Sequence, residues 1–315
     1  MLLSVQIMQI NWVYDGKAPI KVKTFLKKRG VSRRLLSHVR SCGGNILLNG
    51  LPGRKVDKMN TADSLTLLLP VEKSKWDLTP SYVPLDILYE DRDFLIINKP
   101  AGVASIPSFL YPDDSLINRV WGYYLLRGYH GIIPHIATRL DRDTSGVVLI
   151  GKHRYAHSLL DEQLKKHQIK KIYLALLSGI IKADHFTLEL PLGRDPKSFI
   201  KRQVILTGKR ASTEMWKMAE FNDATLCKVS LHTGKTHQIR VHSAYIGHPL
   251  VGDTLYGGRI EMPLQRQALH CQKVTFFHPF KKKMIEITCG LPEDLESYFK
   301  RKKQRGGSRG REQAK

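Results

Sequence analysis

The feature that most constrains the fold is a run of four apolar residues, Val147 to Ile150, that directly follows a charged segment. A short continuous apolar run after Gly146 is typical of a buried β-strand, and the charged residues 139–143 before it predict a loop. Loops held by a rigid scaffold often contain catalytic groups. The sequence therefore predicts a strand in the core of a sheet, with a candidate functional loop at its entrance.

Further apolar segments on either side of this loop indicate that the sheet has several strands. Phe94 to Ile97 form a second apolar run, which ends at Asn98 and Lys99 and is broken by Pro100. Residues 170–179 predict another strand. Between them, residues 156–167 have Leu160 and Leu164 four positions apart, which is the spacing of a helix face. The sequence therefore predicts several strands and at least one helix in this part of the chain.

The segment 17–58 is unusually basic. It contains 12 Lys or Arg and one acidic residue, Asp57, which leaves a net charge of +11. Gly30 separates two predicted helices, and Ser32 is a candidate N-cap for the second. An apolar strand then precedes an Asn-Gly turn at Asn49 and Gly50, and residues 64–70 predict another strand. Two helices and a small β-element are therefore expected here.

The charge balance points to a polyanionic partner. The whole chain has 51 Lys and Arg against 28 Asp and Glu, a formal charge of +23. Such charges could simply solvate two amphipathic helices, but a solvated face normally mixes both signs. A cluster of one sign attracts phosphate. We therefore expect contacts with a nucleic acid from the basic segment, at Lys27, Lys28, Arg33 and Arg34.

Composition also suggests the domain boundaries. Pro80 and Pro84 mark residues 71–84 as the best linker candidate. We predict a small basic domain at 1–80 for binding nucleic acid, with its core at about 17–70, and a larger domain at 85–298. Residues 299–315, rich in Lys, Arg and Gly, are expected to form a disordered basic tail.

Several other classes of protein fit the sequence poorly. The four cysteines are scattered without a CxxC pair, which favours buried, reduced thiols over a zinc or disulfide framework. No apolar run of about 18 residues and no signal peptide is present, so we expect a cytoplasmic location.

Residues 234–236 resemble the end of a phosphate-binding loop, but Val229 replaces the required glycine. His232, His237, His242 and His248 lack the spacing of a metal motif, and ordinary structural roles are expected for them.

The charged loop itself offers two candidate catalytic carboxylates. Asp141 lies beside Arg139, and a neighbouring cation would favour the ionised form that a carboxylate nucleophile needs. Asp143 is a competing candidate. The two could form an acid and base pair, or could be ordinary turn residues, and their spacing does not decide between these possibilities.

Residues 139–146, RLDRDTSG, resemble the signature of the RluA-type pseudouridine synthases, whose catalytic aspartate follows Arg-Leu. By this resemblance Asp141 is the catalytic carboxylate. The family commonly has His before the Arg, where this chain has Thr138. The basic segment in turn resembles the small αL-type RNA-binding module that is named after a ribosomal protein of the small subunit.

Two further blocks match the family in the expected order. Lys171, Tyr173 and Ala175 match one pattern, which implies that Tyr173 lines the site and serves as the base for a proton. A lone tyrosine on an apolar strand would otherwise be assigned to core packing. Residues 231–258 match the last block, which implies that Arg240 pairs with Asp141, orients it, and occupies the space left when the target base leaves its stack.

The resemblance implies an α+β fold with a long, bent, largely antiparallel sheet. It also implies that the protein is a monomeric isomerase that needs no cofactor. Its substrate would be RNA, ribosomal or transfer. Asp141 would act on the ribose, either attacking C1′ or assisting proton removal at C2′. Arg139 and Lys99 are further candidate RNA contacts, although Lys99, at a strand end, fits an ordinary exposed lysine equally well. Two alternatives stay open: a non-catalytic RNA-binding ribosome-assembly factor, and a glycosidase-like hydrolase with paired carboxylates.

Overall fold

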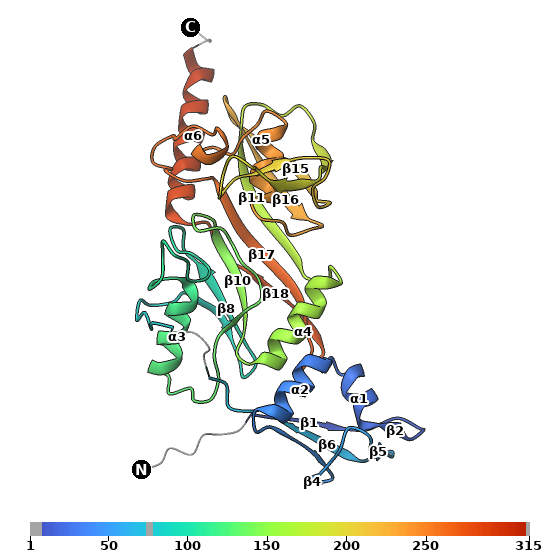
Figure 1. The fold of residues 1–315 in the computed structure, drawn as a ribbon. Coiled ribbons are helices and arrows are strands. Elements are labelled where there is room, and N and C mark those ends of the chain that lie inside the picture. The colour runs from blue at the N-terminus through green and yellow to red at the C-terminus, as the bar shows by residue number, and fades with distance from the viewer. Residues whose placement is uncertain (1–7, 74–77, 313–315) are drawn as a thin grey trace.

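The computed structural model describes residues 8–73 and 78–312, which form an α+β structure with one large and one small main sheet. The N-terminal part lies at one end and the C-terminal helix at the other, with the large sheet between them (Figure 1). The predicted fold class, a mixed and largely antiparallel sheet preceded by a small α/β element, is confirmed.

The basic N-terminal segment folds as the sequence predicts. The Ser32 hydroxyl accepts a hydrogen bond from the Leu35 backbone N–H and caps the second helix. Asn49 and Gly50 both have positive φ angles, as a tight hairpin turn requires. The four-stranded sheet has the order β1-β6-β3-β4. Its elements are β1 (Gln9–Val13), α1 (Val22–Lys28), α2 (Arg33–Ser41), β3 (Asn45–Leu48), β4 (Leu51–Pro52) and β6 (Ser64–Leu68), with β2 (Ile20–Lys21) and β5 (Lys58–Met59) as a separate pair.

The large sheet has ten strands, and its central path has the order β12-β15-β16-β11-β17-β10-β8-β7. Only β10 and β17 pair in parallel among the described strands of this sheet; the others pair antiparallel. The strands are β7 (Ile87–Glu90), β8 (Phe94–Lys99), β9 (His135–Ile136), β10 (Ser145–Gly151), β11 (Lys170–Ser178), β12 (His185–Glu189), β15 (Ser212–Glu220), β16 (Ala224–Leu231), β17 (Leu269–His278) and β18 (Lys283–Thr288).

All seven residues of β10 are buried, as the apolar run after the charged loop predicts. The core around it contains the apolar residues of β8 and the inward residues of β11 and β17. Helices and a short hairpin complete this part. They are α3 (Leu116–Leu126), α4 (Arg154–Lys165), β13 (Leu192–Arg194), β14 (Arg202–Val204), α5 (Gln238–Tyr245), the 3-10 helix η1 (Thr254–Tyr256) and α6 (Glu293–Glu312).

Helix α4 joins the N-terminal part to the large sheet. Tyr155 and Leu159 of α4 belong to the N-terminal apolar cluster, and the Tyr155 hydroxyl donates to the Arg29 carbonyl at 2.5 Å. Gly30 has a φ of +81°, and a Cβ there would lie 2.4 Å from the Leu159 side chain. In the predicted linker, buried Glu72 accepts a hydrogen bond from the Arg154 N–H. The predicted boundaries stay predictions, but the segments on either side are in direct contact.

The C-terminal end differs from the sequence expectation. Residues 299–312, predicted to be part of a disordered tail, continue helix α6, and residues 313–315 lie outside the described residues. The helix is anchored just before the basic run, where Leu295 and Tyr298 are buried. Lys302 adds ion pairs with Asp223 and Glu261 at 2.5 and 2.9 Å. The basic run alone does not reveal these anchors, because the acidic partners of Lys302 lie in distant parts of the sequence.

The four cysteines are all free. Cys227, Cys271 and Cys289 are buried as expected, whereas Cys42 is exposed at the end of α2, which corrects the expectation of four buried thiols. Among the described residues, no helix is both long enough and apolar enough to span a bilayer.

Candidate active site

The charged loop of residues 139–144 ends where β10 begins to pair with β17. Gly146 has a φ of +120°, and a Cβ at this position would come within 2.2 Å of the Cys271 carbonyl oxygen. Only glycine allows the two strands to approach so closely there. The loop therefore leads into β10 at the point where β10 pairs in parallel with β17, and Asp141 lies just before this point in the sequence.

Buried donors hold the backbone of the loop in place. The Ser105 hydroxyl donates to the Leu140 carbonyl at 2.6 Å and accepts from the Leu140 N–H at 3.0 Å. Buried donors fix a loop because leaving its carbonyls unpaired away from water would be costly. Three more contacts follow: Lys99 Nζ to the Arg142 carbonyl at 2.9 Å, Arg266 to the Asp143 carbonyl at 3.0 Å, and Gln267 Nε2 to Thr144 Oγ1 at 3.2 Å.

Lys99 corrects a sequence prediction. Its side chain is fully buried, so it is not a phosphate contact on the surface. Its ammonium group donates to three carbonyls, those of Pro100, Val103 and Arg142, at 2.7 to 2.9 Å. The sequence placed Lys99 at a strand end, but burial there depends on the distant loop that covers it. Lys99 is a positioning residue for the Asp141 loop.

The buried lysine predicts a specific pH dependence of stability. Burial lowers the pKa of Lys99 to about 7 from its ordinary 10.5. Between these values the unfolded chain binds more protons than the folded chain, so the contribution of Lys99 to stability rises with pH. Relative to Lys99→Met, the free energy of unfolding should increase above pH 7 by up to about 1.4 kcal/mol per pH unit. Urea unfolding of both proteins from pH 6 to 9 measures this, and a difference that stays constant would refute it.

Arg240 lies between two carboxylates. From α5 it donates to Asp141 Oδ2 at 3.0 Å, and it makes a two-pronged contact with Asp253 at 2.7 and 2.8 Å. Both Arg240 and Asp253 are buried, whereas the Asp141 side chain keeps 25% of its surface exposed. Asp253 thus fixes Arg240, and Arg240 orients Asp141. The suggestion that Arg240 fills the space of a departed base is wrong, because its guanidinium is buried and bound on both sides.

The network around Asp141 also includes His237, for which an ordinary structural role was expected, and Asp253 and Tyr256, which the sequence did not single out. His237, the N-cap of α5, lies with Nε2 3.8 Å from Asp141 Oδ2, and its Nδ1 is 2.8 Å from the Tyr256 hydroxyl. Burial lowers the pKa of His237. The Tyr256 ring lies 5.2 Å from the Arg240 guanidinium. His237, Asp253 and Tyr256 all fall within the matching block 231–258, which was the available signal.

The other three histidines of this block have ordinary roles, as predicted. His232 pairs with Glu214, and His242 and His248 hydrogen-bond the carbonyls of Leu190 and Ser178. His237 therefore differs from its neighbours in sequence because it faces the carboxylate.

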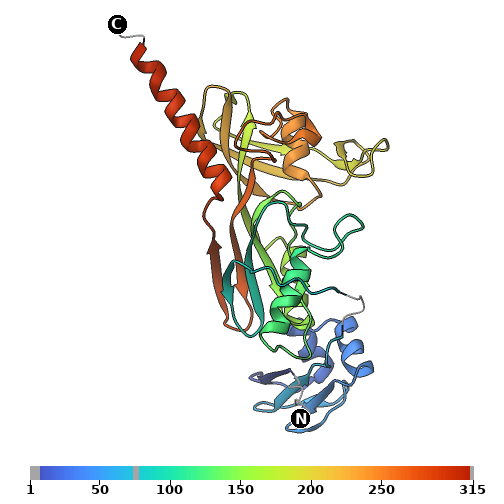
Figure 2. The same cartoon turned by 90° about the vertical axis from the view of Figure 1, so that its left-hand side faces the viewer.

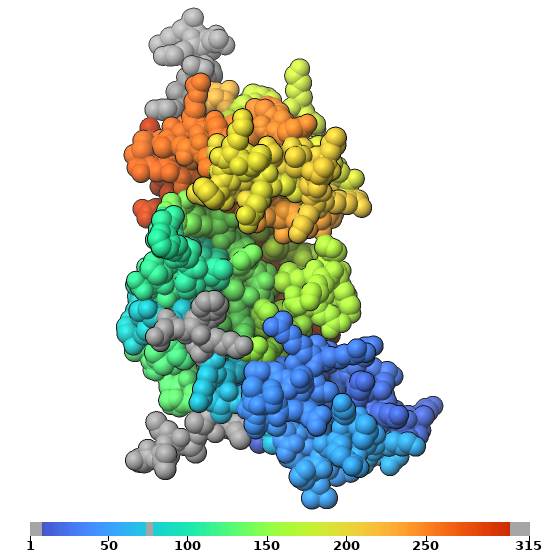
Figure 3. All heavy atoms as spheres, viewed as in Figure 1, coloured from blue at the N-terminus to red at the C-terminus, as the bar shows by residue number. Residues whose placement is uncertain are grey.

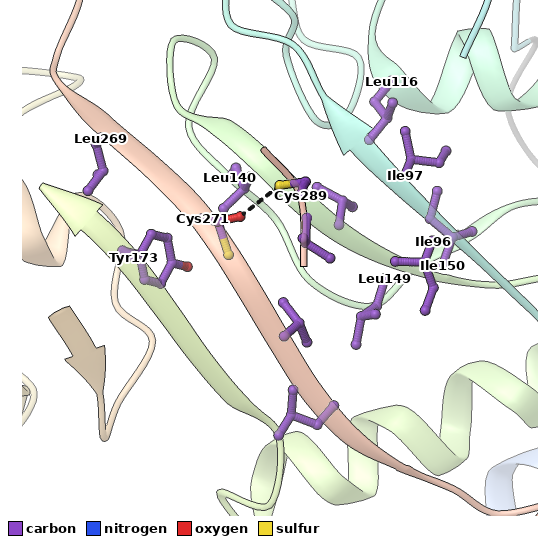
Figure 4. Close-up of a cluster of buried hydrophobic side chains, with 14 of the residues drawn as sticks. Ile96, Ile97, Leu116, Leu140, Leu149, Ile150, Tyr173, Leu269, Cys271 and Cys289 are labelled. Carbon is purple, nitrogen blue, oxygen red and sulfur yellow. Dashed lines mark hydrogen bonds between the residues drawn. The ribbon is translucent and has the colours of Figure 1, made fainter. Parts of the chain in front are cut away.

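Tyr173 is both a core residue and a neighbour of the site. It is buried in the central apolar cluster, and its ring extends from β11 toward Cys271 (Figure 4). Burial, the Cys271 thiol and the charge of Asp141 together raise the pKa of Tyr173 well above 10. Its hydroxyl is therefore protonated at neutral pH. The effect of Asp141 shows that the two side chains are within electrostatic reach of each other.

The other charged residues of the loop, Arg139, Arg142 and Asp143, form no ion pair with Asp141 among the described residues. Arg142 binds both oxygens of Asp143, at 2.9 and 3.0 Å. Arg139 is exposed and has no ion pair within residues 8–73 and 78–312. Thr138, in place of the family's usual His, accepts a hydrogen bond from the Leu149 N–H at 2.9 Å and ties the loop to β10.

The basic residues of the N-terminal part are not close to Asp141. Lys27, Lys28, Arg33 and Arg34 are exposed on α1 and α2, at the far end of the molecule from α5 (Figure 1). The predicted site residues thus fall into two groups. One group lies at the loop of residues 139–144 and consists of Arg139, Asp141, Tyr173 and Arg240. The other group is the four N-terminal cations, which form a separate basic surface.

Comparison with known proteins agrees with this arrangement. The family profile described as RNA pseudouridylate synthase matches residues 93–245, which include the Asp141 loop, Tyr173 and Arg240. An uncharacterized RNA pseudouridine synthase of Bacillus subtilis, YjbO, is 39% identical over 279 residues, covering 89% of this chain and 98% of the relative. Ribosomal large subunit pseudouridine synthase D of Xylella fastidiosa is 35% identical, covering 83% of this chain and 82% of the relative.

The fold is also similar to that of a solved human protein, RNA pseudouridylate synthase domain containing 1. The TM-score is 0.56 at 24% identity, covering 67% of this chain and 85% of that one. The two sequence relatives are matched over 98% and 82% of their own length, and the profile covers the loop, β11 and α5. The chain therefore belongs to the RluA-type family of RNA pseudouridine synthases, which are isomerases of uridine in RNA.

Proposed function

We propose that this enzyme isomerises specific uridines of ribosomal RNA, with Asp141 as the catalytic carboxylate. The observation that supports this is the geometry of Asp141. It is the partly exposed member of the Asp141–Arg240–Asp253 group, and the two buried members fix its orientation. A carboxylate held in this way is ready to act on a ribose carbon without reorganising its surroundings.

The reaction breaks the bond from C1′ to N1 of uridine, turns the base, and joins C1′ to C5. Asp141 either attacks C1′ or removes the C2′ proton to give a glycal, and both routes need an ionised carboxylate. Arg240 keeps one oxygen occupied, which leaves the other oxygen of Asp141 for the ribose. Reaching the bond requires a uridine that is flipped from a helix or displayed in a loop.

Tyr173 is the proposed partner for the C5 proton that is lost at the end. Its raised pKa means that the hydroxyl is protonated before the reaction. A role as a base therefore requires that Tyr173 passes its own proton on as it accepts the proton from C5. Its position on the apolar side of the site also keeps water away from that step.

A glycosidase-like hydrolase fits the site less well. Such an enzyme needs a second carboxylate that can protonate a leaving group or activate water. Asp253 is buried and bound at both oxygens by Arg240, and Asp143 is bound at both oxygens by Arg142. Neither is available as the second acid or base.

Ribosomal RNA is favoured as the substrate because three relatives, each matched over 80 to 82% of its length, are named as ribosomal large subunit pseudouridine synthases. The exposed cations of α1 and α2 supply the sequence-independent phosphate contacts that a large RNA needs.

The choice of substrate is tested by incubating the purified enzyme with unmodified transcripts of large-subunit ribosomal RNA and of transfer RNAs. Pseudouridine is then mapped by carbodiimide labelling. Modification at a few ribosomal positions is expected. Modification of transfer RNA alone would contradict the choice of substrate, and RNA binding without modification would favour an assembly factor.

A further inference from the structure

Two aromatic side chains near the site are exposed almost completely. Phe109, in the segment between β8 and α3, is 98% exposed, and Phe199, in the loop between β13 and β14, is 102% exposed. Leu110 and Ile200 beside them are also exposed. Single exposed apolar residues are common, but two almost fully exposed phenylalanines, on segments linked by hydrogen bonds to one site, indicate a binding surface for a ligand.

The first of these segments is fixed to the Asp141 loop. Ser108 and Tyr111 exchange two backbone hydrogen bonds, at 3.1 and 3.0 Å, which place Phe109 and Leu110 at the tip of a tight turn. Arg142, the residue after Asp141, lies over the Tyr111 ring at 5.1 Å and donates to its hydroxyl. Phe109 is thus presented by a structured turn that contacts the catalytic loop.

The second segment is connected to the site through Tyr256. The Arg202 N–H donates to the Tyr256 hydroxyl at 2.9 Å, and this hydroxyl contacts His237, the neighbour of Asp141. Within the loop, Asp195 and Ser198 accept backbone hydrogen bonds from Lys197 and Lys201. The loop that presents Phe199 is therefore ordered by its own polar residues.

Both segments project from the same face of the large sheet (Figure 2). In the space-filling view, the blue-green residues near position 110 and the yellow residues near position 200 reach the surface on one side of the molecule (Figure 3). Basic residues accompany both aromatic residues. The segment of Phe109 contacts Arg142 through Tyr111. The segment of Phe199 itself contains Arg194, Lys197, Lys201 and Arg202. Aromatic side chains among cations match unpaired nucleotides, which offer flat bases and phosphates together.

We propose that Phe109 and Phe199 are stacking platforms for unpaired bases that flank the target uridine, one on each side of Asp141. The inference rests on the proposed function and narrows its substrate to uridines in loops or junctions of RNA. A continuous helix keeps its bases stacked on one another and offers them to neither ring. The platforms thus favour RNA whose bases around the uridine are already splayed.

Binding of fluorescently labelled oligouridylate, about 12 nucleotides long, tests the proposal by anisotropy. Phe109→Ala and Phe199→Ala should each weaken binding about tenfold, because stacking on one aromatic ring contributes that much. Trp at either position should restore binding and Leu should not, since only a flat ring stacks. Leu126→Ala, which removes an exposed apolar residue of α3, is the matched control and should bind as the wild type does.

Three outcomes would overturn the proposal. Unchanged binding by both Ala variants would show that the rings do not contact RNA. Full binding by the Leu variants would show apolar contact without stacking. Loss of self-association in the Ala variants, seen by sedimentation, with RNA binding intact would assign the rings to a second copy of the chain. Pseudouridine formation on ribosomal transcripts, assayed separately, decides the proposed function whatever the rings do.

Discussion

Replacement of Asp141 by asparagine is expected to lower the rate of pseudouridine formation at least about 10⁴-fold, the scale on which loss of a covalent or acid-base group acts. Asparagine has the same shape and can still accept the hydrogen bond from Arg240, which lies 3.0 Å from Asp141. It lacks the negative charge that either route at the ribose requires. The measurement is the single-turnover rate on a modified transcript, with RNA affinity determined in parallel and expected to change little.

Asp143→Asn is the matched control, because Asp143 is the other carboxylate that the sequence offered. Its two oxygens are bound by Arg142, whose side chain is largely exposed. We expect a loss of at most about tenfold, since exposed ion pairs contribute little. A large loss for Asp143→Asn together with a small loss for Asp141→Asn would reverse the assignment.

Replacement of Arg240 by methionine is expected to have the second largest effect, on both stability and rate. The change leaves the buried carboxylate of Asp253 without its partner. Breaking a buried pair in this way costs about 3–5 kcal/mol. Asp141 also loses the group that orients it, so the rate of pseudouridine formation should fall by about 10²-fold or more. Urea unfolding and single-turnover rates measure the two effects.

The double variant Arg240→Met with Asp253→Leu separates stability from orientation. Removing both charges should recover much of the lost stability, because no unpaired buried charge remains. The rate should stay low, because Asp141 still lacks its donor. Recovery of the rate along with stability would mean that Arg240 acts only as a structural residue.

The elements of the fold that depend on local pattern were predictable from the sequence. The buried strand β10, helix α4, and the Asn49–Gly50 turn follow from apolar runs, four-residue spacing and turn chemistry. The grouping of Asp141 with Arg240, 99 positions later, was not visible in any spacing. It came from the resemblance of two separate blocks to one family.

Features that depend on long-range packing were missed. The sequence around Lys99 is typical of a surface residue. In the structure it is buried, because the segment after it and the Asp141 loop cover its side chain. His237 and Asp253 have their roles because α5 and the following turn bring them to a loop far away in sequence. The contacts of α6 just after Phe299 likewise involve distant residues, because Lys302 pairs with Asp223 and Glu261. In each case the partner that decides the role is distant in the chain.

The most direct test of the central claim is release of tritium from RNA that contains uridine labelled at C5, comparing the wild type with Asp141→Asn. The wild type is expected to release one tritium for each pseudouridine formed and no free uracil, and Asp141→Asn is expected to release none while still binding the RNA. Tritium release by Asp141→Asn at the rate of the wild type would contradict the role of Asp141. Free uracil with the label retained would show a hydrolase in place of an isomerase.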